Sequence, residues 1–96
     1  MAVMAATITV AQQRPGTYRV EVSEGGSRTV HTVTVDDVYA RSLGGDGVDV
    51  ALLVRRSFDF LLAREPKESI LQSFALPVIR RYFPDYEPEM RRLFTP

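Results

Sequence analysis

Apolar and polar side chains alternate over the first third of the chain. In residues 6–10 isoleucine and valine alternate with threonine, and in residues 17–23 tyrosine and valine alternate with charged or polar residues. A period of two residues is typical of a strand that buries one face. Residues 28–35 are rich in β-branched side chains and continue the pattern, with His31, Val33 and Val35 on one side.

Short segments with turn chemistry join these three predicted strands. Pro15 presets φ for a turn and Gly16 tolerates a positive φ, so residues 14–17 are expected to reverse the chain. The pair Gly25-Gly26 supplies the tight loop of a second hairpin. Because both connections are short, neighbouring strands run in opposite directions, and residues 1–35 are predicted to form a three-stranded antiparallel meander.

The period of the pattern becomes helical after Asp36. An aspartate at this position can cap a helix, because its carboxylate accepts a hydrogen bond from a free N–H of the first turn. The sequence predicts a short helix over residues 37–43, with Val38 and Tyr39 directed inward. Gly44 suits the residue that follows a helix and is expected to end it.

A longer and more apolar helix is predicted over residues 50–64, capped by Asp49. One face carries Val50, Leu53, Val54, Phe58, Leu61 and Leu62. Ala51, Leu52 and Phe60 extend the apolar surface around the cylinder, so only a narrow polar stripe remains. A helix of this kind is typical of a central element with partners on two sides.

Prolines divide the rest of the chain into short helical segments. Pro66 suits the first position of a helix, predicted over residues 66–74. A second helix is predicted to begin at Pro77 and end before Pro84, and Pro88 opens a last turn. The fold class expected is therefore α+β: the meander (residues 1–35) followed by three or four α-helices (residues 36–96), in one domain of 96 residues.

Composition narrows the possible chemistry. Twelve basic and twelve acidic residues cancel, which argues against a chain built mainly to hold nucleic acid or an anionic membrane. The chain contains no cysteine and one histidine, so disulfides, thiolate zinc sites and multi-histidine metal sites within one chain are excluded. No metal or other cofactor is expected. No secretory leader or membrane-spanning run is evident either, so a cytoplasmic location is expected.

The remaining polar motifs have simple structural interpretations. Asp36-Asp37 lies between a strand and a helix, where capping accounts for it. The glycine-rich segment at residues 44–47 precedes a helix, but Val48 and Asp49 follow it instead of the lysine and hydroxyl residue of a phosphate-binding loop.

His31 is expected to be a strand histidine that is hydrogen-bonded to a neighbour, since no nucleophile or orienting group accompanies it in the sequence. A small enzyme or ligand-binding protein stays an alternative, with a pocket between sheet and helices that contains His31 or Tyr18. No catalytic residue is assigned.

Arginine supplies eleven of the twelve basic residues, and six of these arginines form doublets. Two doublets stand next to aromatic residues: Arg80-Arg81 and Arg91-Arg92. Guanidinium groups beside aromatic rings are typical of proteins that bind single-stranded nucleic acid. A nucleic-acid-associated regulator that uses these four arginines is therefore an alternative function, although residues 55–96 carry only eight basic against six acidic residues.

The pattern F-x-F-L-L-x-R-E-P-x-E-S-I-L over residues 58–71, followed by Y-F-P-x-Y at residues 82–86, resembles a family of small prokaryotic proteins with no established activity. The resemblance extends over roughly residues 17–90. It implies no catalytic residues. The junction Arg64-Glu65-Pro66 and the ending at residues 82–84 are both explained by a helical corner.

A non-enzymatic interaction module is the function that the sequence favours. The main helix and the proline-divided tail carry more apolar surface than a thin meander can cover, and a domain of this size has a small stability margin. The chain is therefore expected to associate with a protein partner, most simply with a second copy as a dimer. Phe60, Leu93 and Phe94 are the residues expected to remain uncovered for this interface.

Overall fold

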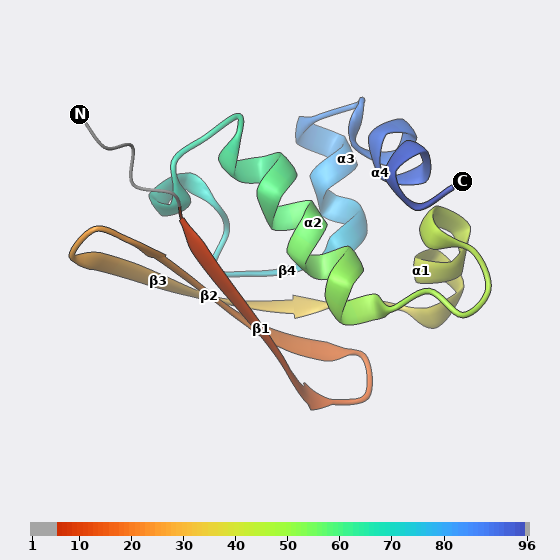
Figure 1. Cartoon of the computed structure of the whole chain (residues 1–96), viewed down its shortest axis with the longest axis horizontal. Helices are drawn as coiled ribbons and strands as arrows, with labels where there is room; N and C mark the ends of the chain where they lie inside the picture. The colour runs from red at the N-terminus through yellow and green to blue at the C-terminus, as the bar shows by residue number, and fades with distance from the viewer. Residues whose placement is uncertain (1–5, 96) are drawn as a thin grey trace.

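A computed structural model describes residues 6–95 and shows an α+β domain (Figure 1). Its elements are, in chain order, β1 (Thr7–Arg14), β2 (Thr17–Glu24), β3 (Ser27–Thr34), α1 (Asp37–Gly44), α2 (Val50–Leu62), the 3-10 turn η1 (Lys67–Ser69), β4 (Ser73–Ala75), the 3-10 turn η2 (Leu76–Val78), α3 (Ile79–Tyr82) and α4 (Tyr86–Phe94).

The three predicted strands form the antiparallel meander that the alternation indicates. Thr7 pairs with Ser23 at one end of β1–β2, and Glu24 pairs with Ser27 across the second hairpin. Gly25 has a φ of 56°, which a glycine adopts without strain. The inward face carries Ile8, Tyr18, Val20, Val22, His31 and Val33, all buried. β1 extends four residues beyond the predicted strand, because the β1–β2 pairing continues to Arg14.

A fourth strand replaces the helix predicted over residues 66–74. η1 occupies three residues after Pro66, and β4 then pairs in parallel with β3, so that Phe74 lies opposite Val33. The sheet is therefore mixed, in the order β1-β2-β3-β4. Ile70 and Phe74 are both buried, but the free edge of β3 supplies the hydrogen-bond partners, and this long-range pairing outweighs the local helical signal.

α1 begins at the predicted residue, but the side chains that it turns toward the core differ from the predicted ones. The Asp36 carboxylate accepts a hydrogen bond from the backbone N–H of Tyr39 at 3.3 Å, the capping contact expected of it. The buried side chains are Ala40 and Leu43, whereas Val38 is 65% exposed, so the prediction that Val38 points inward is wrong. The helix continues through Gly44 because the following glycine takes the positive φ, 85°, that ends it.

α2 is the central helix of the domain, as its apolar surface predicts. The Asp49 carboxylate accepts from the N–H of Leu52 at 3.2 Å and fixes the start of the helix. Figure 1 shows α2 above one face of the sheet and α4 farther from the strands, next to α1. The Phe58 ring lies 6.1 Å from the Phe74 ring, which joins α2 to β4. The helix ends at Leu62, two residues before the predicted end.

The tail covers the other side of α2. Tyr86 and Met90 of α4 are fully buried against it, and Phe83 is half-buried. Tyr82, directly before Phe83, is 65% exposed, because adjacent residues of a short helix point in different directions. Within residues 6–95, no helix has the length and apolar character needed to cross a membrane.

Candidate functional site

A groove of about 570 Å³ runs between α2 and α4. Its walls include Leu52 from α2 and Leu93 from α4, which are 39% and 48% exposed. Met90, Phe60 and Phe94 also line it. The structure thus brings Phe60, Leu93 and Phe94 into one groove, although α2 and α4 are separated by more than twenty residues of sequence. We call this feature the α2–α4 groove.

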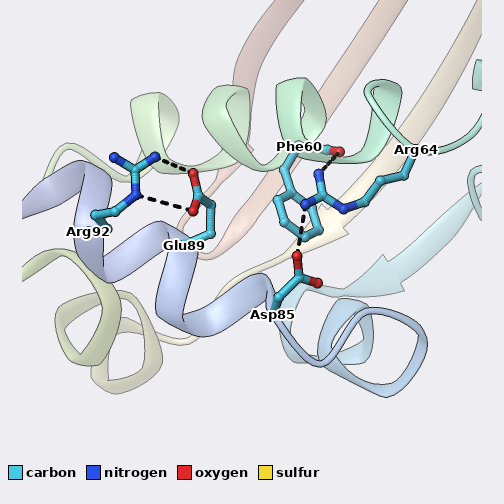
Figure 2. A network of polar contacts seen from close by, with 5 residues as sticks. All are labelled: Phe60, Arg64, Asp85, Glu89 and Arg92. Atoms are coloured by element: carbon cyan, nitrogen blue, oxygen red, sulfur yellow. Dashed lines mark hydrogen bonds and ion pairs between the residues drawn. The ribbon is translucent and has the colours of Figure 1, made fainter.

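Phe60 lies deeper in the α2–α4 groove than the sequence suggests. Its side chain is buried, and the Arg64 guanidinium lies 3.5 Å from the centroid of its ring (Figure 2). The rings of Phe83 and Tyr86 contact it edge-on, at centroid distances of 6.0 and 5.4 Å. The expectation that Phe60 remains uncovered is therefore wrong. The i,i+4 spacing of Phe60 and Arg64 is the sequence signal that could have indicated this cover.

Arg64 is held over the Phe60 ring from two sides. Its Nη1 donates to the backbone carbonyl of Phe60 at 3.0 Å, and its Nη2 donates to the Asp85 carboxylate at 2.8 Å. Figure 2 shows the guanidinium between these two acceptors. Because Asp85 directly precedes α4, this arginine, which lines the groove, ties the start of α4 to the end of α2.

Charges of both signs border the apolar centre of the groove. Arg56 pairs with Asp59 on α2 at 3.1 Å, and Arg92 pairs with Glu89 on α4, where Figure 2 shows two parallel contacts. The Arg92 hydrogen bonds hold the pKa of the Glu89 carboxyl below its usual value. All four side chains are accessible to solvent, so each pair contributes little to folding and can exchange partners at small cost.

The arginines of the nucleic-acid hypothesis are mostly engaged with acidic residues. Arg80 and Arg91 both approach Glu87, at 3.0 and 3.9 Å, and Arg92 pairs with Glu89. Arg81 forms no ion pair within the described residues. Three of the four positive charges are therefore compensated, and the continuous basic stripe typical of a nucleic-acid surface is not formed by them.

His31 and Tyr18 are both buried, and neither lines the α2–α4 groove. The His31 ring is buried, its Nδ1 donates to the Leu71 carbonyl at 2.8 Å, and its Nε2 accepts from the Thr29 hydroxyl at 2.9 Å. Both ring nitrogens are thus used inside the fold, as the structural interpretation of this histidine predicts. Tyr18 is buried in the sheet face, and burial raises the pKa of its hydroxyl.

A smaller groove of about 160 Å³ lies beside the end of α2, and no pattern in the sequence indicates it. Residues of α2, β4 and α3 line it, together with the segment that joins α2 to β4. Glu65 is the one charged residue among those lining residues. We call this second feature the Glu65 groove. Among residues 6–95, no three histidine, aspartate or glutamate side chains are close enough to hold a metal ion.

No family model, curated protein or solved structure matches the chain. The resemblance based on residues 58–71 and 82–86 therefore stays a prediction. The two grooves are the features from which a function can be argued.

Proposed function

We propose that the protein is a non-enzymatic interaction module that associates with a second copy of itself through the α2–α4 groove. The observation that carries the proposal is the position of Leu52 and Leu93. Both are large apolar side chains left open to solvent, on two different helices, and they line the same groove. Burial of these side chains by a partner is favourable because it removes apolar surface from water.

The charge pattern of the groove suits a partner with the same surface. In a two-fold dimer, the same patch faces itself, so each charge must meet the opposite charge of the other copy. Each helix carries a positive and a negative side chain at the groove: Arg56 and Asp59 on α2, and on α4 the lining residue Glu89 with its partner Arg92. Either helix can therefore pair with the other copy without like charges being forced together.

The chemistry of the groove favours binding over catalysis. Its lining residues are apolar side chains and the four titratable residues Arg56, Asp59, Arg64 and Glu89. All four form ion pairs inside the protein at 3.1 Å or less: Arg56 with Asp59, Arg64 with Asp85, and Glu89 with Arg92. Among the described residues, no hydroxyl or imidazole lines the groove, and its two carboxylates, Asp59 and Glu89, are each paired with an arginine.

Molecular mass in solution tests this proposal. At micromolar concentration, light scattering coupled to size exclusion is expected to give about twice the 10.8 kDa of one chain. Leu93→Glu places an unpaired charge in the apolar centre and is expected to raise the dissociation constant by about thirtyfold or more, the loss typical of a central interface residue.

The matched control is Val38→Glu, because Val38 is equally apolar, is 65% exposed and lies on α1, outside the lining of the groove. This variant is expected to retain the mass of the unmodified protein. A monomeric unmodified chain would contradict the proposal, and so would equal dissociation of the Leu93 and Val38 variants.

A further inference from the structure

The Glu65 groove differs in character from the α2–α4 groove and shares no lining residue with it. Leu61 and Phe74 form part of its apolar wall, and two exposed side chains, Leu71 and Tyr82, stand at its edge. Leu71 is 46% exposed and Tyr82 is 65% exposed. Their exposure at the rim of an apolar groove indicates a surface that a ligand can cover.

The polar groups of this groove are few. Apart from Glu65, Ser69 and the Tyr82 hydroxyl, every lining side chain is apolar. An apolar groove with a small number of placed polar groups is typical of a small-molecule site. The single charge in the lining therefore decides which kind of ligand is favoured.

The Glu65 carboxylate has no basic partner among the described residues. Arg64, directly before it, is occupied by Asp85 and by the Phe60 carbonyl. Lys67, two residues after it, pairs with Glu24 at 3.3 Å and with Glu68 at 2.8 Å. The cations nearest in sequence are thus committed elsewhere. Partial burial raises the pKa of the Glu65 carboxyl, so this group lacks part of its contact with water as well as a partner.

We propose that the Glu65 groove binds a small organic ammonium ion with an apolar body about the size of a benzene ring. The volume of about 160 Å³ sets the size of the body, because an apolar protein cavity of about 150 Å³ holds benzene. The Glu65 carboxylate pairs with the ammonium group. The rings of Phe83 and Tyr82 add faces on which a cation or an aromatic ring can pack.

The size of the groove favours a free small molecule over a peptide. A volume that holds one ring leaves no space for a backbone with several anchoring side chains. Glu65 is half-buried, so pairing does not require the full dehydration of a deeply buried charge. The proposal is independent of self-association, since the two grooves have no residue in common.

A titration of the isotope-labelled full chain with two matched probes tests the proposal. The probes are 2-phenylethylamine and 2-phenylethanol, which have the same ring and spacer and differ in charge. Amide shifts that saturate are expected at Leu71, Phe74 and Phe83, with the amine binding about fivefold more tightly than the alcohol, the effect of one partly exposed ion pair.

Two variants that each remove one negative charge show whether the preference for the amine depends on Glu65. Glu65→Gln is nearly isosteric and is expected to remove the preference for the amine while the alcohol still binds. Asp59→Asn, in the α2–α4 groove, is expected to retain the preference. The proposal is overturned if neither probe shifts these amides, if the alcohol binds the unmodified protein as tightly as the amine, or if Glu65→Gln retains the preference.

A pH series on the unmodified protein tests the ion pair separately, because a structural effect of Glu65→Gln would not produce a pH-dependent affinity for the amine. Because the carboxyl must be ionised to pair, the affinity for the amine is expected to fall as pH drops through the raised pKa of Glu65, whereas the affinity for the alcohol stays constant. The other titratable side chain of the lining is Tyr82. Arg64, Glu68, Arg80 and Arg81 are directly next in sequence to lining residues, and Lys67 lies on η1. An amine affinity that does not change over this range would contradict the pairing.

Discussion

Buried polar side chains join separate elements at the residue scale. The Tyr86 hydroxyl lies 2.7 Å from Ser57 Oγ, which itself donates to the Leu53 carbonyl at 2.7 Å. Since the serine proton is used by that carbonyl, the tyrosine is the donor between the two side chains. Both residues are fully buried, and burial raises the pKa of Tyr86. This pair fixes α4 against α2 below the α2–α4 groove.

Tyr86→Phe is expected to lower the free energy of unfolding by about 1 kcal/mol. The variant keeps the ring and leaves Ser57 Oγ with one acceptor position unfilled, in a site from which water is excluded. Urea unfolding measures the loss, and Tyr82→Phe is the control because that tyrosine is exposed. Equal stability of the two variants would show that the buried hydrogen bond is not important.

Glu87 is the acceptor that holds α1, α3 and α4 together. It accepts from the Tyr39 hydroxyl at 2.7 Å and from Arg80 at 3.0 Å. The hydrogen bond from Tyr39, followed by the Arg80 charge, lowers the pKa of the Glu87 carboxyl. A carboxyl with a lowered pKa stabilises the fold above its ordinary pKa, and this contribution is lost as pH falls through the lowered value.

Glu87→Gln is therefore expected to cost about 1 kcal/mol at neutral pH, after allowance for partial exposure, and progressively less in acid. Urea unfolding of both proteins at a series of pH values measures the difference. A difference that is the same at neutral and strongly acidic pH would contradict the role assigned to the Glu87 charge. Glu89→Gln is the control, with a smaller expected effect because its pair with Arg92 is open to solvent.

At the scale of elements, local signals fix the starts of helices and long-range pairing fixes the sheet. Asp36 and Asp49 cap α1 and α2 as the sequence predicts, because capping depends on residues three positions apart. β4 could not be predicted in this way. Its three residues pair with β3, about forty positions earlier, and nothing local to Phe74 indicates that partner.

Asp49→Ala is expected to lower stability by about 1 kcal/mol, since it removes the acceptor for the Leu52 N–H at the start of the central helix. The matched control is Asp46→Ala, whose carboxylate is fully exposed and lies 4.0 Å from Arg41. Thermal or urea unfolding of the two variants measures the difference. If the control is destabilised as much as Asp49→Ala, the cap is not the cause.

For the candidate site, the sequence predicts which apolar residues line the groove, but not how far other side chains bury them. Phe60, Leu93 and Phe94 do line one groove, because the helical period places Phe60 on α2 beside the tail that packs there. The cover over Phe60 comes from Arg64, which Asp85 holds in place, and from the rings of Phe83 and Tyr86, more than twenty residues away. Such contacts are not visible in a one-dimensional pattern. The Glu65 groove could not be predicted for the same reason, since its walls come from four separate segments.

At the scale of the whole molecule, the exposed large apolar side chains are not scattered. Within residues 6–95, four of the five line one of the two grooves: Leu52, Leu93, Leu71 and Tyr82. Val38 is the fifth, and it lies outside both. A 96-residue domain with zero net charge and two apolar grooves has little charge repulsion to oppose association. The distribution therefore supports binding as the general role of the chain.

An isotope-filtered nuclear Overhauser experiment on an equimolar mixture of labelled and unlabelled protein tests self-association through the α2–α4 groove most directly. Contacts between copies are expected from the methyl groups of Leu52 and Leu93. Absence of contacts between copies at a concentration where the protein is dimeric, or contacts confined to the open edge of β1, would contradict the assignment of this groove as the interface.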